Sequence, residues 1–145
     1  MGSGISSELQ QLLAERKIFR ARIDRKMVVK EVEAAETDLV DAQESLELKK
    51  FKWATIQAYY SMFHSTRALL YSRGYREKSH YALLVAIRDL FKNELGGRLI
   101  SSFEEGMTLR QEADYGLNFS EEGAAETAEG AEDLLKKAKE ILKIS

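Results

Sequence analysis

Residues 25–49 carry apolar side chains at alternating spacings of four and three, the strongest periodicity in this 145-residue chain. The side chains that make the pattern are Val28, Val32, Ala35, Leu39, Ala42 and Leu46. Because this spacing keeps one apolar stripe along an α-helix, it predicts a long helix that packs against other helices in a bundle.

Composition agrees with a helical bundle, since the chain has no proline and is rich in residues that favour helices. We predict an all-α fold, an antiparallel four-helix up-down bundle with one or two accessory helices. The length suits a single domain over residues 1–145. The absence of cysteine excludes disulfides, thiolate zinc clusters and cysteine nucleophiles.

Glycine and serine mark the ends of the other expected helices. Gly74 is placed to end one helix in a left-handed conformation, and Ser79 and Ser120 are placed to cap the starts of two more. A looser turn is expected through Phe19. The expected helices other than 25–49 are an accessory helix at 6–17 and longer ones at 51–73, 79–95, 99–115 and from Ser120 to about Leu142.

The helix expected at 51–73 is apolar on more than one side. Tyr59, Phe63, Thr66 and Leu70 fall on one helical stripe, while a second stripe places Tyr60 beside His64, Arg67 and Tyr71. A helix with one solvent-facing side would not carry so many apolar residues. We therefore expect this helix at the centre of the bundle.

Charge is distributed unevenly along the chain. The formal net charge is −2, so no overall positive field attracts nucleic acid. Seven basic residues nevertheless lie in the segment 16–30, whereas residues 121–133 carry only acidic charges. The basic segment is either a solvated connection or part of a phosphate-attracting surface together with Arg73, Arg76 and Lys78.

No membrane span or secretory signal is evident, which favours a cytoplasmic protein that does not act at a membrane.

Arg73 and His80 form the candidate catalytic pair, with six residues between them. A guanidinium group can grip two phosphate oxygens, and an imidazole can remove a proton from an RNA 2′-hydroxyl. The start of a helix at Ser79 would favour neutral His80. The alternative is purely structural, because a cation near a helix C-terminus and a histidine in a first turn are both common.

The sequence does not support a metal centre or a cofactor. Glu77 and His80 form one Glu-x-x-His pair, but Ser61 stands where a second pair would need a glutamate before His64. Zinc-protease spacing, a Gly-x-Ser-x-Gly turn and a phosphate-binding glycine-rich loop are also absent from the sequence. His64, with Tyr60 and Arg67 nearby on its helix, is either a satisfied polar group or a ligand-binding residue.

From about Val32 to Ile144 the chain resembles the HEPN family of small helical proteins. The resemblance is carried by Tyr59-Tyr60, Phe63-His64, the run from Arg67 to Leu70, Lys78-Ser79-His80, and Arg110 with Asp114-Tyr115. It implies an antiparallel bundle that forms homodimers and is often encoded beside a minimal nucleotidyltransferase. The two proteins act together as a toxin and antitoxin pair or as a nucleotide-binding module.

Active toxins of this family are metal-independent ribonucleases that use an arginine and a histidine separated by a short stretch, which corresponds to Arg73 and His80 here. We assign RNA or nucleotide binding to Arg76, Lys78, Ser79, His64 and Arg67. Two positions depart from the active pattern: Gly74 follows the arginine, and Ala82 replaces a tyrosine that partner enzymes modify in some members.

Two hypotheses remain open at this point. One is a dimeric, metal-independent endoribonuclease, and the other is a non-catalytic module that binds a nucleotide or a nucleotidyltransferase. Arg110 and Asp114 are four residues apart and can pair on one helix, with Tyr115 anchoring the following turn, so we interpret them as a structural set.

Overall fold

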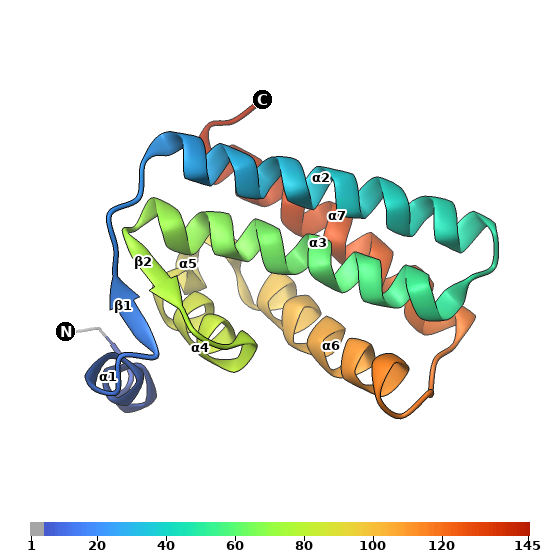
Figure 1. Cartoon of the computed structure of the whole chain (residues 1–145), viewed down its shortest axis with the longest axis horizontal. Coiled ribbons are helices and arrows are strands. Elements are labelled where there is room, and N and C mark those ends of the chain that lie inside the picture. Colours follow the sequence, from blue (N-terminus) through green and yellow to red (C-terminus); the bar gives the residue numbers. More distant parts are fainter. Residues whose placement is uncertain (1–4) are drawn as a thin grey trace.

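The computed structural model describes residues 5–145, which form seven helices and one two-stranded antiparallel sheet. The elements are α1 (Ser7–Ala14), β1 (Ile18–Arg20), α2 (Arg25–Glu47), α3 (Phe51–Ser72), β2 (Tyr75–Glu77), α4 (His80–Leu90), α5 (Lys92–Leu95), α6 (Gly97–Asp114) and α7 (Glu121–Leu142). Helices α2, α3, α6 and α7 alternate in direction as an up-down bundle (Figure 1). The predicted all-α class is confirmed.

Helix α3 is the central helix of this bundle, as its two apolar stripes predict. Ala58, Tyr59 and Ala68 have no exposed surface, and neighbouring helices cover most of the remaining side chains. Two of its buried hydroxyl groups bond to carbonyls: Thr66 Oγ1 donates to Met62 at 2.9 Å, and Ser61 Oγ donates to Ala35 of α2 at 2.8 Å. The buried Ser65 hydroxyl has no hydrogen-bond partner among the described residues. Most, but not all, of the hydroxyl groups that this helix buries therefore have their hydrogen bonds made.

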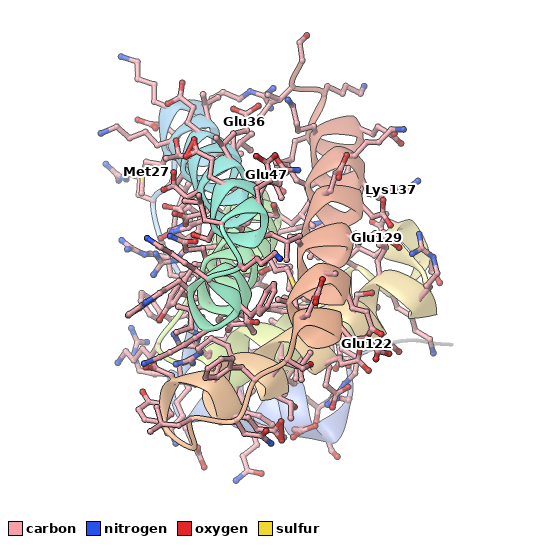
Figure 2. The ribbon with its side chains drawn as sticks, turned by 90° about the vertical axis from the view of Figure 1, so that its right-hand side faces the viewer. Met27, Glu36, Glu47, Glu122, Glu129 and Lys137 are labelled. Carbon is pink, nitrogen blue, oxygen red and sulfur yellow. The ribbon has the colours of Figure 1, made fainter. Side chains whose placement is uncertain are left out.

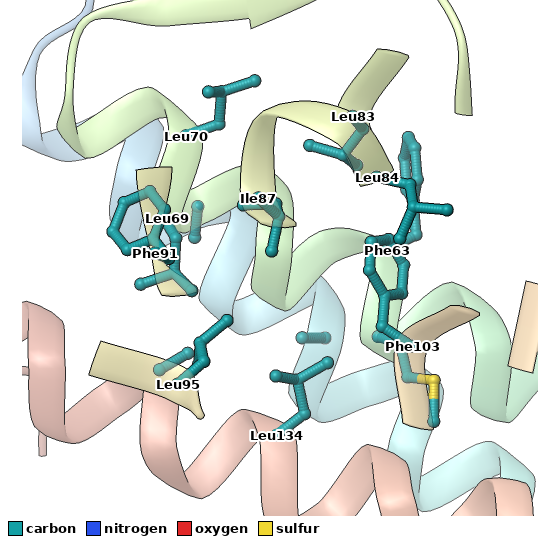
Figure 3. Close-up of a cluster of buried hydrophobic side chains, with 14 of the residues drawn as sticks. Phe63, Leu69, Leu70, Leu83, Leu84, Ile87, Phe91, Leu95, Phe103 and Leu134 are labelled. Carbon is teal, nitrogen blue, oxygen red and sulfur yellow. The ribbon is translucent and has the colours of Figure 1, made fainter. Parts of the chain in front are cut away.

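The apolar core joins α3 to α4, α5, α6 and α7 (Figure 3). Phe103 of α6 and Leu134 of α7 are both fully buried in it. Phe91 is also buried, and there the backbone leaves the helical region with φ −121° and ψ 19°. The helix predicted over residues 79–95 is therefore interrupted at Phe91, because the chain turns as that ring enters the core.

The segment expected to be a turn through Phe19 instead contains β1, which pairs with β2. Ile18 lies opposite Glu77, Phe19 opposite Arg76, and Arg20 opposite Tyr75. Ile18 is 1% exposed, so its inward side chain holds the strand against the helices. Gly74, with φ +83°, ends α3 in a left-handed conformation and reverses the chain into β2, as predicted.

Serine caps form where the sequence predicts them. Ser79 Oγ accepts a hydrogen bond from the Ala82 amide at 3.0 Å, and Ser120 Oγ accepts one from the Gly123 amide at 2.9 Å. Helix α6 begins at Gly97, two residues before its expected start. Within the described part of the chain, no helix is long and apolar enough to cross a membrane.

Replacing Leu134 with alanine is expected to lower the free energy of unfolding by about 2–5 kcal/mol, because the side chain is fully buried and would leave a cavity. Leu48→Ala is the matched control. Leu48 is 66% exposed, so its removal should change stability by less than about 0.5 kcal/mol. Urea denaturation measures both changes, and equal losses in the two variants would contradict the position assigned to α7 in the core.

Candidate functional site

The side chain of Arg73 lies at the far end of α4 from His80. Its guanidinium carbon is 4.3 Å from the centre of the Phe91 ring, and Nη2 is 2.6 Å from Glu94 Oε2. Phe91 follows the last residue of α4, whereas His80 is the first. Since α4 has 11 residues, its ends are roughly 16 Å apart at about 1.5 Å per residue. Within one chain, the structure does not bring Arg73 and His80 to a shared phosphate position.

His80 packs among aromatic side chains of α3. Its ring is stacked on Phe63, with centres 4.6 Å apart, and Nδ1 is 2.6 Å from the Tyr59 hydroxyl oxygen. Tyr60 meets the same imidazole edge-on at 6.0 Å. His80 itself is only partly buried, so the imidazole is both fixed in orientation and open to solvent.

Two arginines supply positive charge near His80. Burial, followed by the charges of Arg110 and Arg67, lowers the pKa of His80 below its ordinary value. Each cause disfavours the positive charge that the imidazole gains on protonation. His80 is therefore neutral near pH 7, as the sequence predicts, although burial and the arginines supply the cause shown by the structure.

Arg110 comes from α6 and is 6% exposed. Its guanidinium carbon lies 5.2 Å from the centre of the Tyr59 ring and 5.8 Å from that of Tyr60. Nη1 is 3.6 Å from Asp114 Oδ2, which confirms the predicted pair within the helix. Among the described residues, its buried Nε has no hydrogen-bond partner. Tyr115 is 77% exposed, so burial does not anchor it.

Arg67 connects α3 to β2. Its Nε and Nη2 both lie 2.9 Å from Glu77 Oε2, and its guanidinium carbon lies 5.0 Å from the Phe63 ring centre. Glu77 is almost completely buried, and its carboxylate thus neutralises part of the Arg67 charge. We define the His80 cluster as His80, Tyr59, Tyr60, Phe63, Arg67 and Arg110.

His64 faces α2 rather than the His80 cluster. Its Nδ1 is 2.8 Å from Glu31 Oε1, and its Nε2 is 3.6 Å from Asp38 Oδ2. Two carboxylates at this distance oppose binding of a phosphate group. His64 links α2 and α3, and we do not include it in the candidate site.

The other predicted binding residues lie on β2 and the turn after it. Arg76 lies over the Tyr71 ring at 5.3 Å, and the Lys78 ammonium group is 5.5 Å from the centre of the Phe19 ring. The hydroxyl of Ser79 is occupied as the cap of α4. The structure therefore brings Arg76 and Lys78 beside β1, while the Ser79 side chain serves the helix.

Sequence reasoning missed the roles of Tyr59 and Arg110 beside His80. Both residues belong to motifs that carried the family resemblance, but the pattern of α3 indicated only burial for Tyr59, and Arg110 had a sufficient partner in Asp114. The signal available in the sequence was the position of Arg110 at spacings of four and three after Phe103 and Met107, which places it on an apolar stripe of its helix. It did not reveal which ring the guanidinium group covers.

These observations define a class of protein: a compact four-helix bundle with a partly exposed histidine at the start of α4. The family model described as "HEPN domain" matches residues 29–145. The chain belongs to the HEPN family.

Relatives of known name agree with this assignment. A Methanocaldococcus jannaschii protein named "Putative toxin MJ0605" is 36% identical over 121 residues, covering 77% of this chain and 88% of its own. An Archaeoglobus fulgidus protein named "UPF0332 protein" is 30% identical over 112 residues, covering 74% and 89%. The crystal structure of TT1696 from Thermus thermophilus has a TM-score of 0.68 at 20% identity, covers 78% of this chain and 96% of its own, and shows a common fold.

The imidazole of His80 is expected to titrate with a midpoint below its ordinary value of 6.5. Arg110→Gln should raise that midpoint, because it removes the arginine whose charge has the larger effect on His80. Arg98→Gln should leave it unchanged, since the Arg98 side chain is 73% exposed and pairs with Asp133. NMR titration of the histidine ring protons measures the midpoint. A wild-type midpoint above 6.5 would contradict the described surroundings of His80.

Proposed function

We propose that this protein is a toxin-type, metal-independent endoribonuclease that uses His80 for proton transfer. The observation that carries the proposal is the position of His80: a neutral, partly exposed imidazole fixed by Tyr59 and flanked by two arginines. Neutral imidazole is the form that can accept a proton, and nearby cations attract the phosphate that must lie beside it. A toxin of this type acts on cellular RNA, so the proposal also locates the protein in the cytoplasm.

His80 removes the proton of a 2′-hydroxyl group, whose oxygen then bonds to the adjacent phosphorus. The bond from phosphorus to the 5′-oxygen breaks, and that oxygen takes a proton from water as it leaves, while the imidazolium returns its proton to the resulting hydroxide. The products are a 2′,3′-cyclic phosphate and a 5′-hydroxyl end. Tyr59 suits this role, because its hydroxyl accepts a hydrogen bond from Nδ1–H. That hydrogen bond leaves Nε2 bare to take the 2′-hydroxyl proton and then stabilises the resulting imidazolium.

The arginines differ in what they can do for this reaction. Arg110 is buried and acts through its charge, which favours the developing negative charge on the phosphate and keeps His80 neutral. Arg67 is more exposed, with 24% of its side chain accessible, and lies next to the stacked rings of Phe63 and His80. It can reach a phosphate oxygen while remaining paired with Glu77.

We propose that Arg73 contributes to the reaction only in a homodimer. Its pair with Glu94 is about 40% exposed on both sides, and an exposed pair of this kind contributes only about 0–1 kcal/mol. We propose that Arg73 of one subunit turns from Glu94 towards the phosphate held at His80 of the other. A minimal nucleotidyltransferase is the partner proposed as antitoxin.

A non-catalytic module is the second candidate. It is favoured by the separation of Arg73 from His80 within one chain and by the buried position of Arg110. The same cluster would then hold a nucleotide or a nucleotidyltransferase segment without cleaving RNA.

Purified protein is expected to cleave labelled RNA in the presence of EDTA and to leave cyclic phosphate ends. His80→Ala should reduce the rate by about 10²–10⁴-fold, the usual contribution of a proton-transfer group. Arg98→Ala is the control and should retain the wild-type rate, because Arg98 lies outside the His80 cluster in an exposed pair. Gel analysis of the fragments measures both. Intact RNA with the wild-type protein would favour the non-catalytic module.

Mixing Arg73→Ala with His80→Ala tests the composite site. Each variant alone should be inactive, whereas re-formed mixed dimers should regain about a quarter of the wild-type rate, since half the dimers are mixed and each holds one intact site of two. Dimer formation is checked by analytical ultracentrifugation. Full activity of Arg73→Ala alone would remove Arg73 from the reaction, and no recovery in confirmed mixed dimers would place Arg73 and His80 in the same subunit's site.

A further inference from the structure

The two-stranded sheet places the basic N-terminal segment beside the candidate site. Strand β1 lies before residue 29, where the match to the HEPN family begins, and pairs with β2 only a few residues before His80 (Figure 1). The Lys78 amide also donates to the Lys17 carbonyl at 2.9 Å, which extends the pairing towards α4. The sequence left undecided whether the basic segment joins Arg76 and Lys78 in one phosphate-attracting surface. The pairing of β1 with β2 brings them together.

Cations and aromatic rings alternate from this surface to His80. The Phe19 ring is partly exposed, whereas Tyr71 and Phe63 are buried and support the cations that lie over them. The Lys78 ammonium group lies near the Phe19 ring, and Phe19 is the direct cross-strand partner of Arg76. Arg76 and Arg67 both lie over Tyr71, at 5.3 Å and 5.5 Å from its ring centre. Arg67 then contacts Phe63, on which His80 stacks. We define the basic aromatic track as Phe19, Lys78, Arg76, Tyr71, Arg67 and Phe63.

The outer end of the track carries positive charge that forms no ion pair within the described part of the chain. Among residues 5–145, neither Arg76 nor Lys78 forms an ion pair with a carboxylate, whereas Arg67 is paired with Glu77. Lys78 is exposed, and Phe19 and Arg76 are partly exposed, so all three are open to a ligand. The acidic residues of α7 lie elsewhere, and Figure 2 shows Glu122 and Glu129 on the outer side of that helix.

We infer that the basic aromatic track binds single-stranded RNA and guides it to His80, an inference that rests on the proposed ribonuclease function. Cations spaced along a surface contact successive phosphates, while an open ring such as Phe19 can stack against an unpaired base. An acidic protein would use the charges but would gain little from the open ring of Phe19. Duplex RNA keeps its bases stacked on one another and cannot use Phe19 in this way.

Fluorescence anisotropy with a labelled single-stranded RNA of about twelve nucleotides tests the inference, a length within the usual range for such binding sites. The full chain carries His80→Ala and is kept in EDTA so that the RNA remains intact. Phe19→Leu, which keeps an apolar side chain but removes the ring, should weaken binding by at least about fivefold. Arg76→Gln with Lys78→Gln should weaken binding and reduce the slope of log affinity against log salt by about 1.4, or about 0.7 for each lost phosphate contact.

Arg98→Gln with Lys137→Gln is the matched control, because it removes the same number of charges from a surface outside the track (Figure 2 labels Lys137 on α7). RNA binding should be unchanged in this control. Thermal unfolding followed by circular dichroism verifies that each variant is folded. Unchanged affinity in the folded track variants would overturn the inference.

Equally tight binding of a duplex of the same length, or equal displacement of the RNA by poly-glutamate, would also overturn the inference. The first result would remove the role of base stacking, and the second would identify an acidic protein as the ligand. Cleavage by protein with His80 intact is measured separately. Failure of the ribonuclease function and failure of the track therefore give different results.

Discussion

The burial of α3 is the constraint on which the rest of the structure depends. Small residues such as Ala58 and Ala68 allow neighbouring helices to approach it closely, and the hydroxyl groups of Ser61 and Thr66 bond to nearby carbonyls. Tyr59 belongs to this buried helix, so its ring cannot turn away, and its hydroxyl is held towards His80. The orientation of the candidate proton-transfer group is therefore fixed by the same packing that holds the bundle together. A loop histidine would have no comparable support.

The long helices could be predicted because each carries an apolar stripe over many turns, as in the seam of α2 and the doubled stripe of α3. The pairing of β1 with β2 could not, since three residues are too few to establish a period of two. Ile18 and Glu77 acquire their inward positions only when two distant segments meet. The break at Phe91 was hidden for a related reason: its side chain continues the apolar pattern of α4, and only the packing of the ring in the core shows that the backbone turns there.

The candidate site was predictable in part. The family resemblance and the position after a capping serine identified His80 and its neutral form, but spacing along the chain could not show the direction of Arg73. Six intervening residues are compatible with two side chains that converge or with two that lie at opposite ends of α4. The intervening β2 strand carries the chain back along α3, which places Arg73 near Phe91 and leaves His80 near the middle of α3. Arg110, although distant from His80 in sequence, therefore lies closer to the imidazole than Arg73 does.

Arg110 and Arg73 differ in how firmly each is held, and this difference decides what each can contribute. The Arg110 guanidinium group is enclosed by Tyr59, Tyr60 and its pair with Asp114, so its charge acts at a fixed position whether or not RNA is bound. Arg73 is held by one exposed carboxylate and by stacking on Phe91, and both contacts can be exchanged for a phosphate oxygen with little loss. A site that combines a fixed buried charge with a movable surface charge can keep His80 neutral before binding and still add a donor when the phosphate arrives. In the proposed homodimer, this division of roles would let Arg73 of one subunit and His80 of the other act on one phosphate, although the two side chains lie apart within one chain.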